Sequence, residues 1–267
     1  MELKFGIDQY MMSQRLANYP NLGKLISKTM GTLNVGQYAR AEIFKNIIRE
    51  LPLDKINTVL DLGCGQGEYT MMLARAFADK QITALDIEEN RISKIYKMSE
   101  RNGLTNIIPY PGSIDTLKVN EYYDFIYSID VFEHIAPNEM PFKEVYKKLK
   151  SGGLFFVKMP NVTQSNVFPE ALFNDHKKWL EDEHIGQVYN LKDLESRLEN
   201  EGFQVIKSFY GDGIISRLAW EIWFLAKKIR PEFQLLITPL LKLLVNIDRV
   251  IPNKNSGNTI QVLAKKI

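Results

Sequence analysis

One apolar stretch of the chain is followed by a short run of carboxylate and imidazole side chains, Asp130-Val-Phe-Glu133-His134. Histidine changes its charge near neutral pH, so His134 could take a proton from an acceptor group during a reaction. Carboxylates and imidazoles are also ligands for divalent metal ions. The residue types therefore favour proton transfer, metal binding or, as the structural alternative, the ordering of a turn after a strand.

A glycine-rich turn lies upstream, in Val-Leu-Asp-Leu-Gly-Cys-Gly-Gln-Gly-Glu-Tyr-Thr (residues 59–70). Glycines let the backbone turn sharply and approach a ligand closely, because a Cβ would forbid the dihedral angles or fill the space. The spacing G-x-G-x-G differs from the dinucleotide fingerprint G-x-G-x-x-G, and Glu68 would repel a phosphate. A nucleotide-like cofactor with a cationic amine fits this turn better, which indicates S-adenosylmethionine.

A second carboxylate follows the next apolar run. Gln-Ile-Thr-Ala-Leu-Asp (residues 81–86) ends in Asp86, about 20 residues after the glycines, where nucleotide-binding folds place the acid that binds ribose. We therefore expect Asp86 to accept hydrogen bonds from both ribose hydroxyls.

These residues need a scaffold, and the sequence alternates between two patterns. Apolar runs occur at residues 58–62, 82–86, 106–110, 124–129, 153–158 and 203–209, and helical patterns at 37–51, 68–79, 89–102, 139–150 and 190–201. Such alternation predicts a parallel sheet with helices on both faces. A final apolar run at residues 259–264 predicts a seventh strand.

Residues from about Tyr38 to Ser208 resemble a class I S-adenosylmethionine-dependent methyltransferase of the small-molecule, quinone or glycan type. Four further blocks follow in the order of that family: Ile-Ile-Pro-Tyr-Pro-Gly-Ser (107–113), Tyr-Asp-Phe-Ile-Tyr-Ser-Ile-Asp-Val-Phe-Glu-His (123–134), Leu-Lys-Ser-Gly-Gly (149–153) and Glu-Gly-Phe-Gln-Val (201–205). The resemblance implies a Rossmann-like, doubly wound α/β sheet of seven strands, with the last strand antiparallel. It also implies that S-adenosyl-L-methionine is the cofactor and S-adenosyl-L-homocysteine the product.

The resemblance further implies which residues contact the cofactor. The predicted contacts to the methionine part are Asp61, Gly63, Cys64 and Gly65, with Ile129 and Asp130 beneath its end. Gly67 is expected to allow close approach of a helix, and Cys64 to act as a small side chain rather than as a nucleophile. Ile87 is expected on the adenine face and Ser113 and Ile114 at its edge. Tyr38 and Arg40 are expected either to cap the cofactor carboxylate or to lie on a helix surface.

The predicted catalytic residues are His134, His184 and Glu133. Many small-molecule members of the family carry a His-Ile pair before the last crossover helix, as His184-Ile185 does here. His184 could orient or deprotonate the acceptor, or it could fix its loop by hydrogen bonds. In relatives the Glu-His pair occurs with a divalent ion and, widely, without one, and we expect no metal here. A base is not obligatory either, because alignment of the acceptor with an activated methyl group already accelerates transfer.

We predict four segments. They are an N-terminal cap (1–36), the cofactor-binding core (37–210, with a substrate loop at 160–189), a helical amphipathic insertion (211–257) and the final strand (258–267). His176, within the substrate loop, is expected on the surface because its neighbours are polar.

The insertion is the main departure from the family, which has a short hairpin at this point. It carries Trp220 and Trp223, residue types that favour membrane interfaces, and basic residues flank its apolar runs. The flanking residues are Lys227, Lys228, Arg230, Lys242 and Arg249. The second apolar run is too short to span a membrane, and Pro239 interrupts it. Residues 214–250 therefore form either a membrane-touching hairpin or a lid or homodimer surface.

Composition narrows the class of protein. Hydrophobic residues make up 45% and charged residues 25% of the chain, and the net charge of +2 predicts no general affinity for nucleic acid. Cys64 is the single cysteine, so no intramolecular disulfide can form. The first residues show no apolar signal segment, which leads us to expect a cytoplasmic protein, with peripheral contact at the inner membrane surface if the hairpin touches lipid.

The predicted acceptor is a small or lipid-linked molecule, with a hydroxyl of a sugar or glycolipid as the first expectation. The alternatives are a quinone or isoprenoid phenol, a catalytically silent module that binds S-adenosylmethionine and, from another class, an NAD-dependent oxidoreductase. Methylation of nucleic-acid bases is disfavoured because the block at residues 128–131 reads Ser-Ile-Asp-Val and not Asn-Pro-Pro-Tyr.

Overall fold

The computed structural model describes residues 2–7, 18–120, 122–186, 188–251 and 255–267. One sheet contains seven strands in the order β3-β2-β1-β4-β5-β7-β6. The strands are β1 (Thr58–Leu62), β2 (Gln81–Asp86), β3 (Ile107–Pro111), β4 (Tyr123–Ile129), β5 (Leu149–Pro160), β6 (Phe203–Gly211) and β7 (Thr259–Lys266). Strands β1 to β5 pair in parallel, whereas β7 is antiparallel to both β5 and β6. The predicted sheet is confirmed, including its antiparallel last strand.

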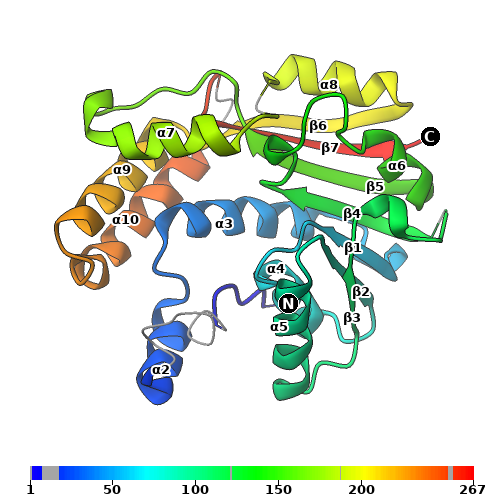
Figure 1. Ribbon diagram of the computed structural model, residues 1–267, viewed down its shortest axis with the longest axis horizontal. Coiled ribbons are helices and arrows are strands. Elements are labelled where there is room, and N and C mark those ends of the chain that lie inside the picture. Colours follow the sequence, from blue (N-terminus) through cyan, green and yellow to red (C-terminus); the bar gives the residue numbers. More distant parts are fainter. Residues whose placement is uncertain (1, 8–17, 121, 187, 252–254) are drawn as a thin grey trace.

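Helices cover both faces of the sheet (Figure 1), and the strands between the two edges are therefore largely buried on both sides. Leu60 of β1 faces the core under α6 (Phe142–Lys148) and α8 (Leu191–Asn200). The neighbouring Val59 faces the opposite core, under α3 (Val35–Glu50) and α4 (Glu68–Ala76). The helix α5 (Glu89–Arg101) extends this second layer over β2 and β3. The predicted helices and strands thus assemble into the layered α/β fold expected from their alternation.

The insertion forms two packed helices, α9 (Ile214–Ile229) and α10 (Phe233–Val250). They lie against α3 at one end of the molecule (Figure 1) and share a small core with it. This core consists of Val35, Ala39, Ala219, Trp223, Leu241 and Val245. The carboxylate of Asp248, near the end of α10, accepts hydrogen bonds from Gly213 N–H (3.1 Å) and Ser216 Oγ (2.9 Å) at the start of α9. One face of the insertion is therefore packed internally.

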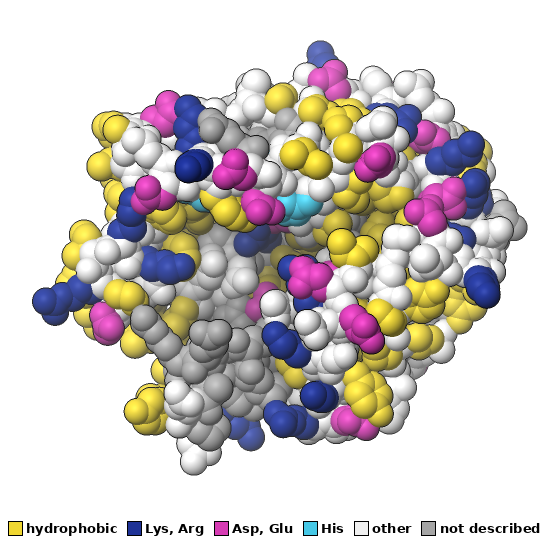
Figure 2. Space-filling model, viewed as in Figure 1, with side chains coloured by type: hydrophobic (Ala, Val, Ile, Leu, Met, Phe, Trp, Pro, Cys, Tyr) yellow, Lys and Arg dark blue, Asp and Glu magenta, His cyan; other side chains and the backbone are white. Residues whose placement is uncertain are grey.

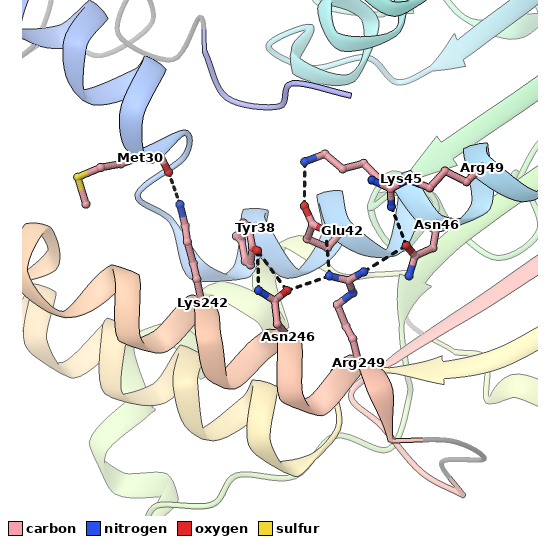
Figure 3. A network of polar contacts seen from close by, with 9 residues as sticks. All are labelled: Met30, Tyr38, Glu42, Lys45, Asn46, Arg49, Lys242, Asn246 and Arg249. Atoms are coloured by element: carbon pink, nitrogen blue, oxygen red, sulfur yellow. Dashed lines mark hydrogen bonds and ion pairs between the residues drawn. The ribbon is translucent and has the colours of Figure 1, made fainter. Parts of the chain in front are cut away.

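A polar network continues this contact between α10 and α3 (Figure 3). Arg249 Nη1 donates to Glu42 Oε2 at 2.9 Å, and Arg249 Nη2 donates to Asn46 Oδ1 at 3.1 Å. Lys242 Nζ donates to the carbonyl oxygen of Met30. These two cations, for which the sequence left a membrane surface and a lid or homodimer surface open, thus bind groups of the protein itself. Trp223 is packed internally as well, since its ring is buried and its Nε1 donates to the Leu33 carbonyl at 2.8 Å.

The segment between β5 and α8 is more ordered than the predicted loop. It contains the short turn η5 (Glu170–Phe173) and the helix α7 (Asn174–Glu183). Acidic Asp175 in the first turn of α7 favours a helix at this point. Further short turns are η2 (Leu53–Lys55), η3 (Ile114–Thr116) and η4 (Phe132–His134), and the segment predicted as an N-terminal cap contains the helix α2 (Pro20–Met30). Within the described ranges, none of the helices has the length and apolarity needed to cross a bilayer.

Candidate active site

The glycine-rich turn joins β1 to α4 through three residues with left-handed backbone. The φ angles of Gly63, Gly65 and Gly67 are 78°, 54° and 75°. A Cβ on Gly63 would lie 2.4 Å from Val131 Cγ2, and one on Gly67 would lie 2.6 Å from Ile95 Cγ1 in α5. A Cβ on Gly65 would meet no atom within 4 Å. Gly63 and Gly67 thus allow close packing of neighbouring elements, whereas Gly65 borders open space where a ligand can approach the backbone.

Asp86, the last residue of β2, is bound to this turn. Its Oδ2 accepts the Gly65 N–H at 2.9 Å, and its Oδ1 accepts the Glu88 N–H at 2.9 Å. The adjacent Ile87 has 79% of its surface exposed, which is unusual for an isoleucine. A buried carboxylate and an exposed apolar side chain therefore stand side by side next to the open space at Gly65, as expected for a ribose and an adenine contact.

The side chains of Asp61 and Cys64 lie beneath the turn. Asp61 Oδ2 accepts from Thr70 Oγ1 in α4 at 2.5 Å, and burial raises the pKa of Asp61 to about 7. Cys64 packs against Met71 and Ile95, and burial raises the pKa of its thiol. We expected these side chains around the cofactor, but both serve the packing of α4 and α5 on the sheet. A cofactor could contact this stretch through its backbone.

Three further predicted cofactor contacts, Ser113, Ile114 and Ile129, lie near the carboxyl ends of β3 and β4. The N–H of Gly112 donates to the Asp86 carbonyl at 2.9 Å, which holds the loop of Ser113 beside the end of β2. Ser113 is half-buried, whereas the side chain of Ile114 is in the core. Ile129, at the end of β4, packs on the core beneath α3. The backbone of this loop, rather than the Ile114 side chain, is available at the predicted adenine edge.

Asp130 follows β4 with a φ of 53°, a left-handed conformation that is uncommon for a residue other than glycine. Its Oδ2 lies 2.5 Å from Arg40 Nη1 in α3, and its Oδ1 lies 2.6 Å from Lys158 Nζ in β5. Burial alone would raise the pKa of Asp130, but Lys158 and Arg40 lower it to about 2. The carboxylate is therefore ionised and held between two cations at the carboxyl ends of β4 and β5.

Glu133 and His134 follow in the turn η4. Glu133 is 1% exposed, and its Oε2 has no hydrogen-bond partner among the described residues. Burial, and then the charge of Asp130, raise the pKa of Glu133 well above its usual value. His134 Nδ1 lies 2.9 Å from the carbonyl oxygen of Glu183. Because a carbonyl oxygen can only accept, Nδ1 carries a proton, and in the neutral ring the lone pair then lies on Nε2.

His184 is brought to the same place as His134. The two rings are 5.1 Å apart between centroids and nearly perpendicular, at 84°. Ligand atoms of Glu133, His134 and His184 lie within 4.8 Å of one another, a spacing that could hold a metal ion. The nearby cations Arg40 and Lys158 disfavour a divalent ion at this position, because they repel its positive charge.

A cavity of about 1020 Å³ opens from this group of residues. Asp130, Glu133 and His134 line it together with residues of α3, α7 and α9. One wall is aromatic, with Phe173, His176, Trp179, Trp220, Trp223 and Phe224. Another wall is polar, with Gln164, Ser165, Asn166, Arg217, Asn258 and Thr259. Figure 2 shows a hollow in this face of the molecule, with histidine at its edge.

The cavity corrects one further expectation and separates Arg40 from Tyr38. His176 was expected on the surface, but its ring lies 4.9 Å from that of Trp220 and 5.7 Å from that of Trp179. Burial, and then the charge of His184, lower the pKa of His176. The structure brings Arg40 to the site, whereas the hydroxyl of Tyr38 donates to Asn246 Oδ1 at 3.1 Å, between α3 and α10.

Sequence reasoning missed Lys158, Arg217 and the aromatic character of the cavity wall. Lys158 left a signal, because it interrupts the apolar run of β5, where an unpaired cation would be costly. Arg217 and Trp220 gave no such indication, since each lies on the helix α9, which was expected in a membrane-touching hairpin, a lid or a homodimer surface.

Comparisons with known proteins agree on one family, the methyltransferases. A family model described as a methyltransferase domain matches residues 35–208. The chain is 31% identical to an (S)-coclaurine N-methyltransferase of Thalictrum flavum subsp. glaucum over 101 residues, 38% of this chain and 28% of that protein. It is 28% identical to a malonyl-[acyl-carrier protein] O-methyltransferase of Priestia megaterium over 134 residues, 47% of each chain. The matches thus span less than half the length of these curated relatives.

A solved structure has the same fold over most of the chain. Phosphoethanolamine N-methyltransferase 2 of Haemonchus contortus, in complex with S-adenosyl-L-methionine, superposes with a TM-score of 0.59 and 18% identity. The superposition covers 90% of this chain and 59% of the other.

Proposed function

The chain belongs to the family of methyltransferase domains, and on this premise we propose that it transfers a methyl group from S-adenosylmethionine to a hydroxyl of a sugar or glycolipid. The observation that carries the acceptor class is the cavity of about 1020 Å³, because it joins His134 to both an aromatic and a polar wall. Sugars offer an apolar ring face and many hydroxyls, so they match a site with stacking surfaces and hydrogen-bonding groups.

The residues around the glycine turn fit the cofactor. The space at Gly65 leaves the backbone accessible, Asp86 offers acceptors for ribose hydroxyls, and the exposed Ile87 offers an apolar surface for adenine. Asp130 is the negative group at the methionine end. When bound there, S-adenosylmethionine supplies a methyl group activated by its positive sulfur.

His134 is the proposed general base. Its Nδ1–H is held by the Glu183 carbonyl, so the lone pair of Nε2 is available to take the proton of the acceptor hydroxyl. His184 stands at right angles to it and would orient the same acceptor. Burial raises the pKa of Glu133, and the protonated carboxyl group can donate a hydrogen bond, whereas an ionised one could only accept.

A second candidate is a quinone or isoprenoid phenol, which the aromatic wall favours. Trp220 stacks with Phe224 at 5.2 Å between centroids, and a flat aromatic acceptor could extend this stack. Amines are a further acceptor class to test, because the relatives include an (S)-coclaurine N-methyltransferase. A lipid-linked acceptor of either kind would bring the protein to a membrane surface through the α9–α10 hairpin.

Two measurements on the intact chain test the proposal. Calorimetry should detect binding of S-adenosylhomocysteine, with an affinity at least about tenfold lower in Asp86→Ala, which removes the ribose acceptor. Transfer of a radioactive methyl group should then be measured with monosaccharides, extracted glycolipids, quinols and amines. Label on a sugar oxygen is the expected result. Label only on amines or quinols would reject the sugar acceptor, and unchanged affinity in Asp86→Ala would reject the cofactor site.

A further inference from the structure

The helix α10 has an apolar face that points away from the protein. Its members recur at intervals of four and three residues, and between 44% and 78% of each is exposed. We call this face the α10 stripe, and its residues are Leu236, Leu240, Leu243, Ile247 and Val250. In a helix such spacing places side chains on one side. The opposite side, with Leu241 and Val245, is buried against α3 and α9.

The turn between α9 and α10 combines apolar and basic side chains at the end of the same hairpin. Ile229 and Phe233 are exposed there, together with Lys227, Lys228 and Arg230. We call these five residues the hairpin tip. Figure 1 shows the turn at one extreme of the molecule, and Figure 2 shows basic and hydrophobic side chains on that edge.

Acidic side chains offset this charge only in part, since Asp175 of α7 pairs with Lys228 at 2.7 Å between Oδ2 and Nζ. Of the three carboxylates between residues 214 and 250, Glu221 and Asp248 are buried. Glu221 accepts the Val167 N–H at 2.8 Å, and Asp248 accepts the Gly213 N–H at 3.1 Å. Only Glu232 is exposed. The hairpin therefore presents apolar surface and positive charge together.

We propose that the α10 stripe and the hairpin tip dock on the surface of an anionic lipid bilayer, with the stripe lying in the interface. A helix that is apolar on one side and bordered by cations binds in this way, because burial of apolar area and attraction to anionic lipids add together. A second copy of the chain is a poorer match, since α10 has no exposed carboxylate that could pair with the basic tip of a partner. The interrupting Pro239 and the cation-rich tip fit a surface position rather than an insertion through the bilayer.

The docked orientation would serve the proposed function by bringing the cavity near lipid. Trp220 and Phe224 of its aromatic wall lie on α9, one helix away from the stripe. The relevance to a lipid-linked acceptor rests on the proposed function, but the docking itself needs no methyl transfer and can be measured alone.

The test is co-sedimentation of the full chain with vesicles of phosphatidylcholine and with vesicles of phosphatidylcholine mixed with phosphatidylglycerol. We expect sedimentation with the mixed vesicles. The double variant Leu236→Ser, Leu240→Ser should weaken binding at least about tenfold, because it removes two large apolar side chains from the stripe. Arg230→Gln should weaken it about fivefold, as the loss of one basic residue near an anionic surface predicts.

Ile206→Ser is the matched control, because Ile206 is 52% exposed on the edge strand β6, outside the hairpin. Its vesicle binding should be unchanged. Affinity for S-adenosylhomocysteine and the thermal midpoint of each variant report whether it folds. The proposal would be overturned if the natural chain did not sediment with the mixed vesicles. It would also be overturned if Ile206→Ser lost as much vesicle binding as the double variant. A dimer that the double variant makes monomeric, without vesicle binding in either, would assign the stripe to a second copy. Vesicle binding without any methyl transfer would count against the proposed function alone.

Discussion

Arg40 and Asp130 form an ion pair at the inner end of the cavity, with 2.5 Å between Arg40 Nη1 and Asp130 Oδ2. The pair links α3 to the turn after β4, and Lys158 of β5 binds the other carboxylate oxygen at 2.6 Å. The Asp130 carboxylate thus connects α3, β5 and the turn after β4. The arrangement fixes Asp130 where the cofactor and the acceptor are proposed to meet, and it makes the site sensitive to the loss of that charge.

Asp130→Asn should destabilise the protein by about 3 kcal/mol, because it leaves two cations without their shared partner. Urea unfolding, followed by circular dichroism, measures the free energy of unfolding. Asp54→Asn is the control, since Asp54 is exposed and outside the site. Equal stability of Asp130→Asn and the natural chain would mean that the three charges contribute no net stability.

The same carboxylate predicts a dependence of stability on pH. The pKa of Asp130 is lowered from 3.8 to about 2 in the folded protein, so its contribution is complete above pH 4 and is lost as the pH falls towards 2. Between pH 6 and pH 3 this loss amounts to about 1 kcal/mol. The difference in unfolding free energy between the natural chain and Asp130→Asn should therefore shrink by that amount at pH 3. A constant difference over this range would contradict the lowered pKa.

The glycine turn predicts two different outcomes for similar substitutions. Gly63→Ala should destabilise the protein by at least about 2 kcal/mol, because its Cβ would lie 2.4 Å from Val131, and the second change Val131→Ala should restore part of the loss. Gly65→Ala meets no neighbour, so it should cost only about 1 kcal/mol, for its left-handed backbone.

Cofactor affinity separates the two glycines further. Gly65→Ala should weaken S-adenosylhomocysteine binding much more than its small effect on stability suggests, because the added methyl enters the space proposed for the ligand. Thermal unfolding and calorimetry on the same samples provide both numbers. Normal affinity in Gly65→Ala would show that the cofactor does not approach this backbone.

The sequence was sufficient to predict the sheet, because its signals are local. Each strand is a short apolar run, and the turn after β1 has glycines that a left-handed backbone requires. Asp86 could be placed for the same reason, as it ends a strand next to that turn. The direction in which a side chain points depends on tertiary packing and is harder to predict. Asp61 and Cys64 belong to the same motif, but their side chains are buried in the core.

The cavity could not be predicted, because its walls come from segments far apart in the chain. Trp220 on α9 and His176 on α7 meet only when the insertion packs on the core. The raised pKa of Glu133 also depends on burial and on the charge of Asp130, which the sequence does not reveal. The cavity and the pKa of Glu133 thus depend on tertiary contacts, whereas the motif residues could be recognised from their residue types and their spacing in the sequence.

His134 provides the sharpest test of chemistry. His134→Asn keeps a donor that can reach the Glu183 carbonyl but removes the basic Nε2, so kcat for a hydroxyl acceptor should fall about 10² to 10⁴-fold. Affinity for S-adenosylhomocysteine should not change, because His134 lies on the acceptor side of the site. The matched variant His176→Asn alters the aromatic wall and should raise KM for the acceptor with a smaller effect on kcat. The two variants therefore separate proton transfer from acceptor binding. If His134→Asn retains kcat, alignment of the acceptor with the methyl group is sufficient and no base is required.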